Sequence, residues 1–503
     1  MPVRISHGAL GNGVMGQLVE VQAHLSNGLP GMTIVGLPDT SISEARDRVR
    51  AAVASCGFTW PTGRITVGLS PAFEHKRGSG LDLAIAMAVL AAADTVPAAA
   101  VADTIFLGEL GLDGSLRAVP GAIAMALAIA KGRPGCQIVA SPQTAAQISA
   151  VPGVMSVPAT DLQQVVQILT GVATAAEVTP APLAPEPALT PPDLADVIGQ
   201  GRACRSLEIA AAGGHHLLLH GPPGVGKTML ARRLPGLLPP LTDGEALEVA
   251  AVRDAAEGGL PHLDHCPPFQ APHHSSTHVA MVGGAIGGIL RPGQISQAHL
   301  GVLFLDEAPE FPRQTLEALR QPLESGTVSI ARAAFCERLP ARFQLILAAN
   351  PCPCGDVGTA TCTCTAAEVR RYSQRLSGPL LDRIDMRIRV GPPNGQQPGN
   401  PTTQVRARVQ AARQRSERRL QGSGERINSR VPGEWLRRMH PPDSTGVELL
   451  ERWRNEQRLG MRALDRILRL CWTIADLADL DVPGEDEIHE AAAMRQGAMG
   501  AQP

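Results

Sequence analysis

The sequence of 503 residues is poor in several features, and each shortage narrows what the protein can do. Aromatic residues make up only 3% of the chain, in a composition otherwise typical of a globular protein. The formal net charge is −2, which provides no general attraction for nucleic acid or anionic membranes. No run of about 18 uncharged apolar residues occurs, and residues 1–10 lack a basic segment followed by an apolar one. We therefore expect a protein that is neither secreted nor membrane-spanning and that works in the cytoplasm.

Lysine is also scarce, because Lys76, Lys131 and Lys227 are the only three in the chain. Nearly all other basic residues are arginines, so a lysine kept inside a glycine-rich loop is a functional candidate. Ten cysteines are present. In a reducing cytoplasm they do not indicate a disulfide framework.

Two proline-rich segments divide the chain into three regions. Residues 172–192 are rich in Ala and Pro without hydrophobic periodicity, which predicts a semi-extended linker, and residues 391–404 have a similar breaker-rich composition. A chain of this length exceeds one hydrophobic core. We expect a multidomain α/β protein with an α+β domain at 1–171, an α/β domain at 193–390 and an all-α domain at 391–503.

Hydrophobic patterns predict the main elements of each region. Short apolar runs predict strands at Leu18–Leu25, Arg64–Leu69, His216–His220, Val302–Leu305 and Leu345–Ala349. The last three have the length and continuity of buried parallel strands. Longer periodic or apolar segments predict helices at Ile42–Ser55, Leu81–Ala93, Thr228–Arg233, Thr403–Leu420, Gly446–Glu456, Met461–Leu480 and Glu485–Gln496.

A phosphate-binding loop lies between a predicted strand and a predicted helix. The segment fits the pattern G-x-x-x-x-G-K-[ST], in which glycines let backbone N–H groups face phosphates at a helix N-terminus. The lysine reaches the β- and γ-phosphates of ATP, and the threonine hydroxyl ligates Mg²⁺. The predicted nucleotide-binding residues are Gly221, Pro222, Pro223, Gly224, Val225, Gly226, Lys227, Thr228 and Met229.

Polar residues at the ends of the next two strands complete a hydrolytic site. Asp306 and Glu307 follow Val302–Leu305, a pattern in which the first carboxylate holds the Mg²⁺ shell and the second activates the attacking water. Asn350 ends the following strand, where an amide can orient that water. Alone it would be an ordinary turn residue. In this order the residues predict ATP hydrolysis.

Four cysteines form two Cys-x-Cys pairs on a short loop, namely Cys352, Cys354, Cys362 and Cys364. Four thiolates can hold a tetrahedral Zn²⁺ ion. The spacing is tighter than in common Cys-x-x-Cys knuckles, so a reduced thiol-rich loop stays open as the alternative.

Three further segments carry histidine or arginine. Residues 271–288 hold three histidines and are expected to be a polar loop at a subunit or pore surface rather than a metal site. The pattern of residues 325–343 predicts a β-hairpin. A guanidinium group can bind a phosphate through two hydrogen bonds, so Arg332, Arg338 and Arg342 are candidates for DNA contact. The alternative is a solvated hairpin. Six arginines between 406 and 419 predict a solvated helix face, with DNA or subunit contacts as the alternatives.

Together these motifs resemble the magnesium-chelatase-like AAA+ ATPases and, among them, the bacterial YifB/ComM family. The resemblance covers almost the whole chain. It rests on GLPGMTIVGLPD (28–39), ARDRVRAAV (45–53), APHHSS (271–276), PGQISQAHLGVLFLDE (292–307), ANPCPCG (349–355) and SGPLLDRID (377–385).

The resemblance implies that Arg383 is an arginine finger, which completes the nucleotide site of a neighbouring subunit. It implies that Arg462 is a second sensor that contacts the γ-phosphate. A finger acting between subunits implies a homo-hexameric ring. The family further implies a DNA helicase that drives branch migration on branched or single-stranded DNA, promoting recombination of incoming DNA in natural transformation.

The N-terminal region resembles the Lon-protease fold. Here the sequence has Gly80 where a serine nucleophile would stand, with Ser79 one position early, and Ile123 where a lysine base would stand. Acyl transfer needs both groups. We therefore expect a Lon-like domain that is catalytically silent.

Two other functions stay open. The chelatase-like core suggests an ATPase subunit for metal insertion. The N-terminal region argues against this function, because that region does not resemble chelatase motor subunits. The Lon-like fold suggests an ATP-dependent protein unfoldase or protease, against which Gly80 and Ile123 argue.

Overall fold

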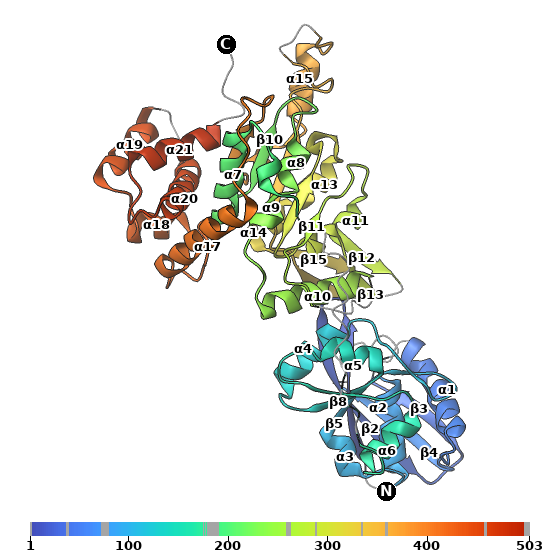
Figure 1. Cartoon of the computed structure of the whole chain (residues 1–503). Coiled ribbons are helices and arrows are strands. Elements are labelled where there is room, and N and C mark those ends of the chain that lie inside the picture. Colours follow the sequence, from blue (N-terminus) through green and yellow to red (C-terminus); the bar gives the residue numbers. More distant parts are fainter. Residues whose placement is uncertain are drawn as a thin grey trace. The chain divides into compact units, whose positions relative to one another are not determined.

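The computed structural model describes residues 3–36, 40–71, 80–174, 176, 178, 191–257, 263–286, 289–332, 335–357, 361–456 and 460–496. They form two compact units, and Figure 1 colours the chain by residue number. Unit 1 contains the described parts of 1–186, 242–264 and 283–293, and unit 2 contains those of 187–241, 265–282 and 294–503. Two segments of the range 193–390 therefore pack within unit 1, while most of the predicted linker lies outside the described residues.

Unit 1 is built on a mixed sheet of seven strands in the order β3-β4-β2-β1-β5-β8-β9. Strand β2 pairs antiparallel with β1 and β4, and the other neighbours pair parallel. The strands are β1 (Arg4–Asn12), β2 (Met15–Ser26), β3 (Gly31–Val35), β4 (Arg64–Ser70), β5 (Thr104–Leu107), β8 (Gln137–Ala140) and β9 (Met155–Pro158). Two small ribbons pair β6 (Glu109–Leu110) with β7 (Leu116–Arg117) and β12 (Gly283–Ile286) with β13 (Ile289–Pro292).

Helix α2 is buried at every residue, as its apolar sequence predicts, and shares a core cluster with residues of α1 and α6, while α4, α5 and α10 share another. Its one charge, Asp82, accepts two hydrogen bonds from the Arg48 guanidinium, at 2.7 and 2.9 Å, because a buried carboxylate requires a charged partner. The helices are α1 (Thr40–Ser55), α2 (Asp82–Ala92), α3 (Ala98–Asp103), α4 (Ala122–Gly132), α5 (Pro142–Ile148), α6 (Leu162–Leu169) and α10 (Asp243–Glu257).

Helix α10 belongs to unit 1 although it follows the phosphate-binding loop in sequence. Its apolar residues Leu247, Ala250 and Ala251 share a core cluster with α4. The Asp254 carboxylate accepts a hydrogen bond of 3.4 Å from the backbone N–H of Ile123, near the start of α4. The sequence did not predict this packing, because α10 lies within residues 193–390, which were predicted to form a single α/β domain.

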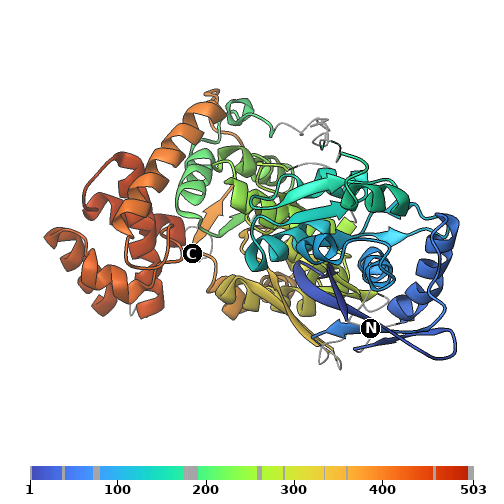
Figure 2. The ribbon, with the colours of Figure 1, turned by 90° about the horizontal axis from the view of Figure 1, so that it is seen from below.

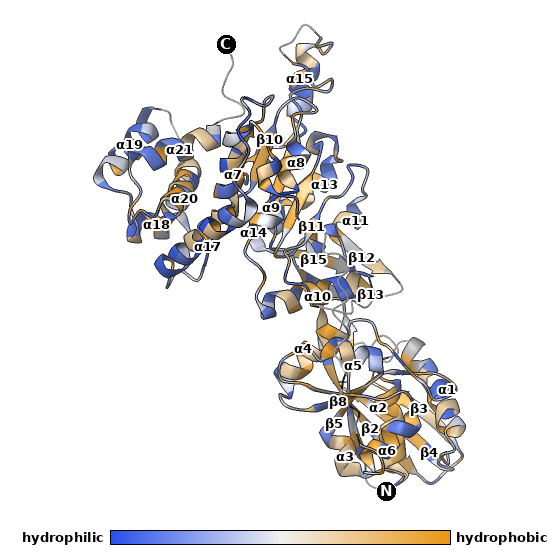
Figure 3. Cartoon of the chain, in the orientation of Figure 1, coloured by the Kyte–Doolittle hydropathy of each residue, from blue (hydrophilic) through white to orange (hydrophobic). Residues whose placement is uncertain are grey.

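Unit 2 contains a sheet of five parallel strands in the order β11-β14-β17-β10-β18. The bounds are β11 (Phe269–Gln270), β14 (Val302–Leu305), β17 (Gln344–Ala349), β10 (Leu217–His220) and β18 (Met386–Arg389), and β15 (Thr327–Arg332) and β16 (Phe335–Pro340) form the predicted hairpin. Every residue of β14 and β17 is buried, and the sheet is coloured as apolar in Figure 3. The three predicted parallel strands are thus confirmed.

Short helices surround this sheet, and a helical C-terminal region follows it. Beside the sheet lie η1 (Leu194–Asp196), α7 (Gly201–Gly213), α8 (Lys227–Ala231), α9 (Leu234–Leu237), α11 (His278–Val282), α12 (Gln294–Gln297), η2 (Ala308–Glu310), α13 (Arg313–Ala318), α14 (Arg320–Ser325), α15 (Ala366–Ser373) and α16 (Gly378–Leu381). The C-terminal helices are α17 (Thr402–Arg419), α18 (Gly433–Met439), α19 (Ser444–Glu456), α20 (Met461–Ala478) and α21 (Glu485–Gln496). The four long ones were predicted, and the seven-residue α18 was missed. Among the described residues no helix has the length and apolar character needed to cross a membrane.

Helix α17, which runs beside α7 in Figure 2, corrects one sequence interpretation. Five of its arginines contact carbonyl or carboxylate groups of unit 2, so the predicted solvated face is wrong for them. Arg408 binds Glu208 of α7 at 2.5 Å, and Arg419 binds the buried Asp476 of α20. The other three are Arg406 to the Gly236 carbonyl, Arg413 to the Ala211 carbonyl and Arg415 to the Asp476 carbonyl. These contacts join α17 to its neighbours.

Candidate nucleotide site

Three neighbouring strands bring the predicted nucleotide residues to one edge of the unit 2 sheet. The phosphate-binding loop follows β10, Asn350 follows β17, and Asp306 with Glu307 follow β14. Because β14, β17 and β10 are adjacent and parallel, their carboxyl ends lie at the same edge. We call Gly221–Thr228, Asp306, Glu307 and Asn350 the nucleotide edge.

The loop turns into α8 at Gly226, whose φ of 94° lies in the left-handed region that favours glycine. Lys227 begins the helix and is largely buried. Its Nζ donates to the carbonyls of Gly221 and Pro222, both at 2.7 Å, and to Asn350 Oδ1 at 2.9 Å. Burial lowers the pKa of Lys227, although the charges of Asp306 and Glu307 act in the opposite direction. The geometry thus joins Lys227 to Asn350, which are 123 residues apart in sequence.

The predicted magnesium ligands also meet. The Thr228 hydroxyl lies 2.6 Å from Asp306 Oδ2, so two oxygen donors of the kind that Mg²⁺ prefers converge beside the loop. Glu307 has φ 50° and ψ 44°, a left-handed conformation that is uncommon for a non-glycine residue and is often found at functional sites. Its backbone N–H donates to Asp306 Oδ1 at 3.0 Å. The residues present therefore fit a magnesium–nucleotide complex.

His274 lies closer to this chemistry than the sequence indicated. Its Nδ1 is 3.3 Å from Glu307 Oε2, and its ring lies 4.1 Å from that of His273, centroid to centroid. His274 comes shortly after β11, which pairs with β14, and this pairing brings the histidine to the carboxylates. From the sequence, His274 was expected only in a polar loop, because the pairing of β11 with β14 could not be inferred from residue patterns.

Arg383 and Arg462 do not join the nucleotide edge. Both line a cavity of about 550 Å³, which we call the arginine cavity. Its charged lining comprises Arg342, Arg383, Arg430, Arg462, Arg466 and Arg469 with Glu324, Asp382, Asp385 and Glu425. Arg383 forms an ion pair with Glu324 and donates to the Pro379 carbonyl at 2.6 Å, and Arg462 is exposed.

The arginine cavity lies at the opposite edge of the sheet. Its lining includes His216, Phe343 and Asp385, the residues directly before β10, β17 and β18. The nucleotide edge lies after the same or neighbouring strands. Strands of four to six residues separate the two edges by about 13 to 20 Å.

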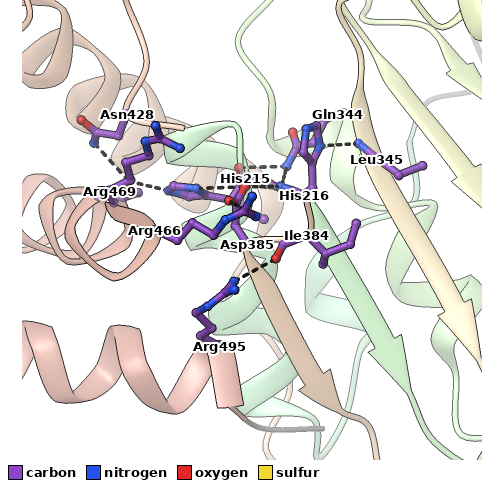
Figure 4. Close-up of polar contacts among 12 residues, drawn as sticks. His215, His216, Gln344, Leu345, Ile384, Asp385, Asn428, Arg466, Arg469 and Arg495 are labelled. Atoms are coloured by element: carbon purple, nitrogen blue, oxygen red, sulfur yellow. Dashed lines mark hydrogen bonds and ion pairs between the residues drawn. The ribbon is translucent and has the colours of Figure 1, made fainter. Parts of the chain in front are cut away.

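A buried polar network supports the arginine cavity (Figure 4). Asp385 Oδ2 accepts a hydrogen bond of 3.1 Å from the His216 N–H, and its Oδ1 lies 3.4 Å from the Arg466 guanidinium. Burial opposes ionisation of Asp385, but His215, whose Nδ1 lies 3.6 Å from Asp385 Oδ2, and the nearby charge of Arg466 outweigh it and lower the pKa of Asp385. Burial also lowers the pKa of His216, to about 4. Since Arg466 belongs to α20, the network joins the C-terminal helices to the strand that follows Arg383.

The other predicted residues are distributed over both units. Arg338 and Arg342 are exposed, in and just after β16, and Arg332 ends β15. In unit 1, Gly80 and Ile123 are both buried, and Ser79 lies outside the described residues. The silence of this unit as a protease stays a prediction.

The four predicted cysteines converge. Their Sγ atoms all lie within 4.8 Å of one another, with Cys352 buried and the others partly buried. The pKa of the Cys354 thiol is lowered to about 6, first by a hydrogen bond with the backbone of Asp356. The donor set is compatible with Zn²⁺.

Models of known protein families match most of the chain. Sequence models described as "Magnesium chelatase, subunit ChlI", "Subunit ChlI of Mg-chelatase" and "Magnesium chelatase, subunit ChlI C-terminal" match residues 193–397, 21–144 and 399–495. The match at 21–144 overturns our argument that the N-terminal region separates this chain from chelatase subunits.

Curated relatives align over nearly full length. Competence protein ComM of Haemophilus influenzae is 42% identical over 513 residues, covering 99% of this chain and 98% of that protein. An uncharacterized protein of Mycobacterium tuberculosis is 46% identical over 494 residues (96% and 97%), and YifB of Escherichia coli is 41% identical over 503 residues (98% and 97%).

Two further similarities are partial. Lon protease 2 of Bacillus subtilis is 28% identical over 186 residues, covering 32% of this chain and 33% of that protein. The Holliday junction branch migration complex subunit RuvB of Rhodococcus erythropolis is 32% identical over 111 residues, covering 19% and 30%. The Lon similarity is thus weak and partial.

Proposed function

The chain belongs to the YifB/ComM family of magnesium-chelatase-like AAA+ proteins, and from this membership and its nucleotide edge we propose that it is an ATP-hydrolysing motor acting on DNA. Its cofactors in this proposal are ATP and Mg²⁺, with a structural zinc ion at the four cysteines. The motor drives branch migration in the cytoplasm and promotes recombination of incoming DNA in natural transformation.

The nucleotide edge supplies each step of ATP hydrolysis. Lys227 binds the β- and γ-phosphates, and Thr228 with Asp306 holds Mg²⁺, which would neutralise charge that develops on the phosphates. Glu307 accepts a proton from the attacking water, and Asn350, hydrogen-bonded to Lys227, orients that water. The left-handed backbone of Glu307 and the nearby His274 set the direction of its carboxylate.

The arginine cavity supports a ring of identical subunits. Arg383 and Arg462 line this cavity at the edge of the sheet opposite to Lys227, so they act on the nucleotide of a neighbouring copy in this proposal. A homo-hexamer is the ring that we assign from the family resemblance. Arg383 then neutralises charge on the transferred phosphoryl group.

The names of two relatives support DNA as the substrate. One is a competence protein that is similar over almost the whole chain, and the other belongs to a Holliday junction branch migration complex. Arg332 and Arg338 lie on the hairpin β15–β16 and Arg342 follows it, and we assign all three to the phosphate backbone of branched or single-stranded DNA. The single observation that carries the proposal is the 42% identity to the competence protein across 99% of this chain.

The proposal is tested by ATP-dependent branch migration on a synthetic three- or four-stranded DNA junction, with Lys227→Ala as the inactive control. We expect the wild type to move the junction and Lys227→Ala to lose both migration and ATPase activity. An active ATPase that neither moves the junction nor responds to DNA would contradict the DNA function. Metal insertion into a porphyrin with candidate partner subunits is then the next assay, because the chelatase family models match 21–144 as well as 193–397. ATP-dependent unfolding of a protein substrate follows it.

A further inference from the structure

The four cysteines are arranged as a metal centre. Cys352 Sγ and Cys354 Sγ are 3.3 Å apart, Cys354 Sγ and Cys362 Sγ are 3.7 Å apart, and all four sulfur atoms lie within 4.8 Å of one another. With Zn–S bonds of about 2.3 Å, sulfur atoms at the corners of a tetrahedron are about 3.8 Å apart. The spacing and the all-sulfur donor set therefore suit a closed zinc site without an open position for catalysis.

We propose that these four thiolates hold a zinc ion that fixes Asn350 and the phosphate-binding loop in their working positions, so that ATP hydrolysis depends on a metal which is not a catalytic ion. The dependence of hydrolysis rests on the proposed ATPase function, whereas the zinc site itself does not. Three separate contacts connect the cysteine cluster to the nucleotide edge.

The first contact is the chain itself. Cys352 stands two residues after Asn350 and is completely buried. Asn350 Oδ1 accepts a hydrogen bond of 2.9 Å from Lys227 Nζ. A metal bound at Cys352 therefore restricts the end of β17 from which the Asn350 side chain reaches Lys227.

The second contact is between Gly355 and the phosphate-binding loop. A Cβ atom built on Gly355 would lie 2.5 Å from Pro223 Cδ, and Gly355 has a φ of +89°. Only a glycine lets the backbone come this close to Pro223 in this conformation. The Gly355 N–H donates a hydrogen bond of 3.0 Å to the Cys352 carbonyl, which closes the turn that contains Gly355. The turn that begins at Cys352 therefore packs against the phosphate-binding loop.

The third contact runs through α15, which begins directly after Cys364. Thr365 and Glu368 form a capping box that fixes the start of this helix. Tyr372 lies on α15 and is buried. Just beyond the helix, Arg375 binds the Pro309 carbonyl at 3.1 Å and Glu310 Oε2 at 2.6 Å, both in the segment that follows Glu307. The metal centre and α15 thus connect all three parts of the nucleotide edge.

The test uses the full-length chain purified without chelators, with zinc measured by plasma mass spectrometry. We expect one zinc per wild-type chain and none in Cys362→Ser/Cys364→Ser, which changes the pair farther along the chain from Asn350. Cys136→Ser, a substitution in unit 1, is the matched control, and we expect this variant to bind one zinc ion per chain. Wild-type protein without stoichiometric zinc would overturn the metal site.

The dependence on the metal is read by hydrogen exchange and by ATPase rate. In the double variant, we expect backbone amides of 221–228 and 345–350 to exchange at least tenfold faster and kcat to fall at least tenfold, while amides of unit 1 are unchanged. Stripping zinc from the wild type with a chelator should reproduce both effects, and added Zn²⁺ should reverse them. Zinc loss with unchanged exchange at 221–228 would overturn the positioning role. A wild type that holds zinc but has no ATPase activity would contradict the proposed function instead, and the exchange measurement would still decide the positioning role.

Discussion

The nucleotide edge and the arginine cavity occupy opposite edges of one parallel sheet and differ in chemistry. The nucleotide edge combines one lysine with a hydroxyl, two carboxylates and an amide, which converge from three neighbouring strands. The arginine cavity gathers six arginines from several elements around four acidic residues. One edge has the donors for a metal–phosphate complex, and the other has an excess of fixed positive charge.

In the proposed function, this difference assigns separate parts of ATP hydrolysis to the two edges. A phosphoryl-transfer site needs both metal ligands and cations that neutralise the transferred group. Here a single chain carries the two sets on edges about 13 to 20 Å apart, as the lengths of the intervening strands require. A ring of copies in which one edge faces the next subunit's opposite edge brings the sets together, and this is the arrangement that the proposed hexamer supplies.

The largest effect that tests this comparison is expected from Arg383→Ala. An arginine finger contributes about 10³ to 10⁵ in rate, so kcat for ATP should fall by at least about 10³ while nucleotide affinity changes little. Steady-state ATPase assays and fluorescent-nucleotide binding measure the two quantities. Arg418→Ala, which removes an exposed arginine of α17, is the control and should keep the wild-type rate.

Glu307→Gln tests the nucleotide edge and should have the next largest effect. Gln keeps the shape of the side chain but cannot accept the proton, so we expect kcat to fall by about 10² to 10⁴ with ATP binding retained. A wild-type rate in this variant would show that the base lies elsewhere.

Mixing the Glu307→Gln and Arg383→Ala proteins sharpens the comparison. In mixed rings some sites combine an intact Glu307 with an intact Arg383 from the neighbour, so activity should rise above that of either variant alone. If mixed samples stay as inactive as their components, the two edges do not complete one another between chains.

The two edges also differ in how well the sequence predicts them. Lys227, Thr228, Asp306 and Asn350 follow short apolar strands in a fixed order, so local pattern and parallel pairing were sufficient to bring them together. His274 was missed, because it reaches Glu307 only through the pairing of β11 with β14.

The arginine cavity depends on contacts between segments that are distant in sequence. Motif comparison identified Arg383 and Arg462, but their shared cavity and the supporting Asp385–Arg466 pair arise where Arg466 of α20 meets Asp385, the residue directly before β18. The same limit applies to α17, where Arg408 and Arg419 bind carboxylates of α7 and α20, and to α10, which packs with unit 1. Residue spacing gives the face of a helix but not the partner that covers it.

The smallest predicted effect is a pH dependence of stability that arises at only one of the two edges, from His216, which lines the arginine cavity. Burial lowers its pKa to about 4, whereas an unfolded histidine titrates near 6.5. Its Nδ1 accepts the Leu345 N–H at 3.0 Å, a bond that protonation of Nδ1 would break. The unfolded chain therefore binds more protons between pH 6.5 and 4, so the contribution to stability is fully present above about pH 6.5 and is lost as pH falls through this window.

The side chain of His216 is only partly buried. We therefore expect its titration to lower the free energy of unfolding by about 1 kcal/mol as the pH falls from 7 to 5. Urea unfolding followed by tryptophan fluorescence measures this, because three of the four tryptophans, Trp435, Trp453 and Trp472, lie in unit 2. His216→Gln, which offers a carbonyl oxygen to Leu345 but does not titrate, should lose about 1 kcal/mol less than the wild type over the same pH change. Equal losses in the two proteins would mean that the arginine cavity tolerates a protonated His216, and the predicted pH dependence would be wrong.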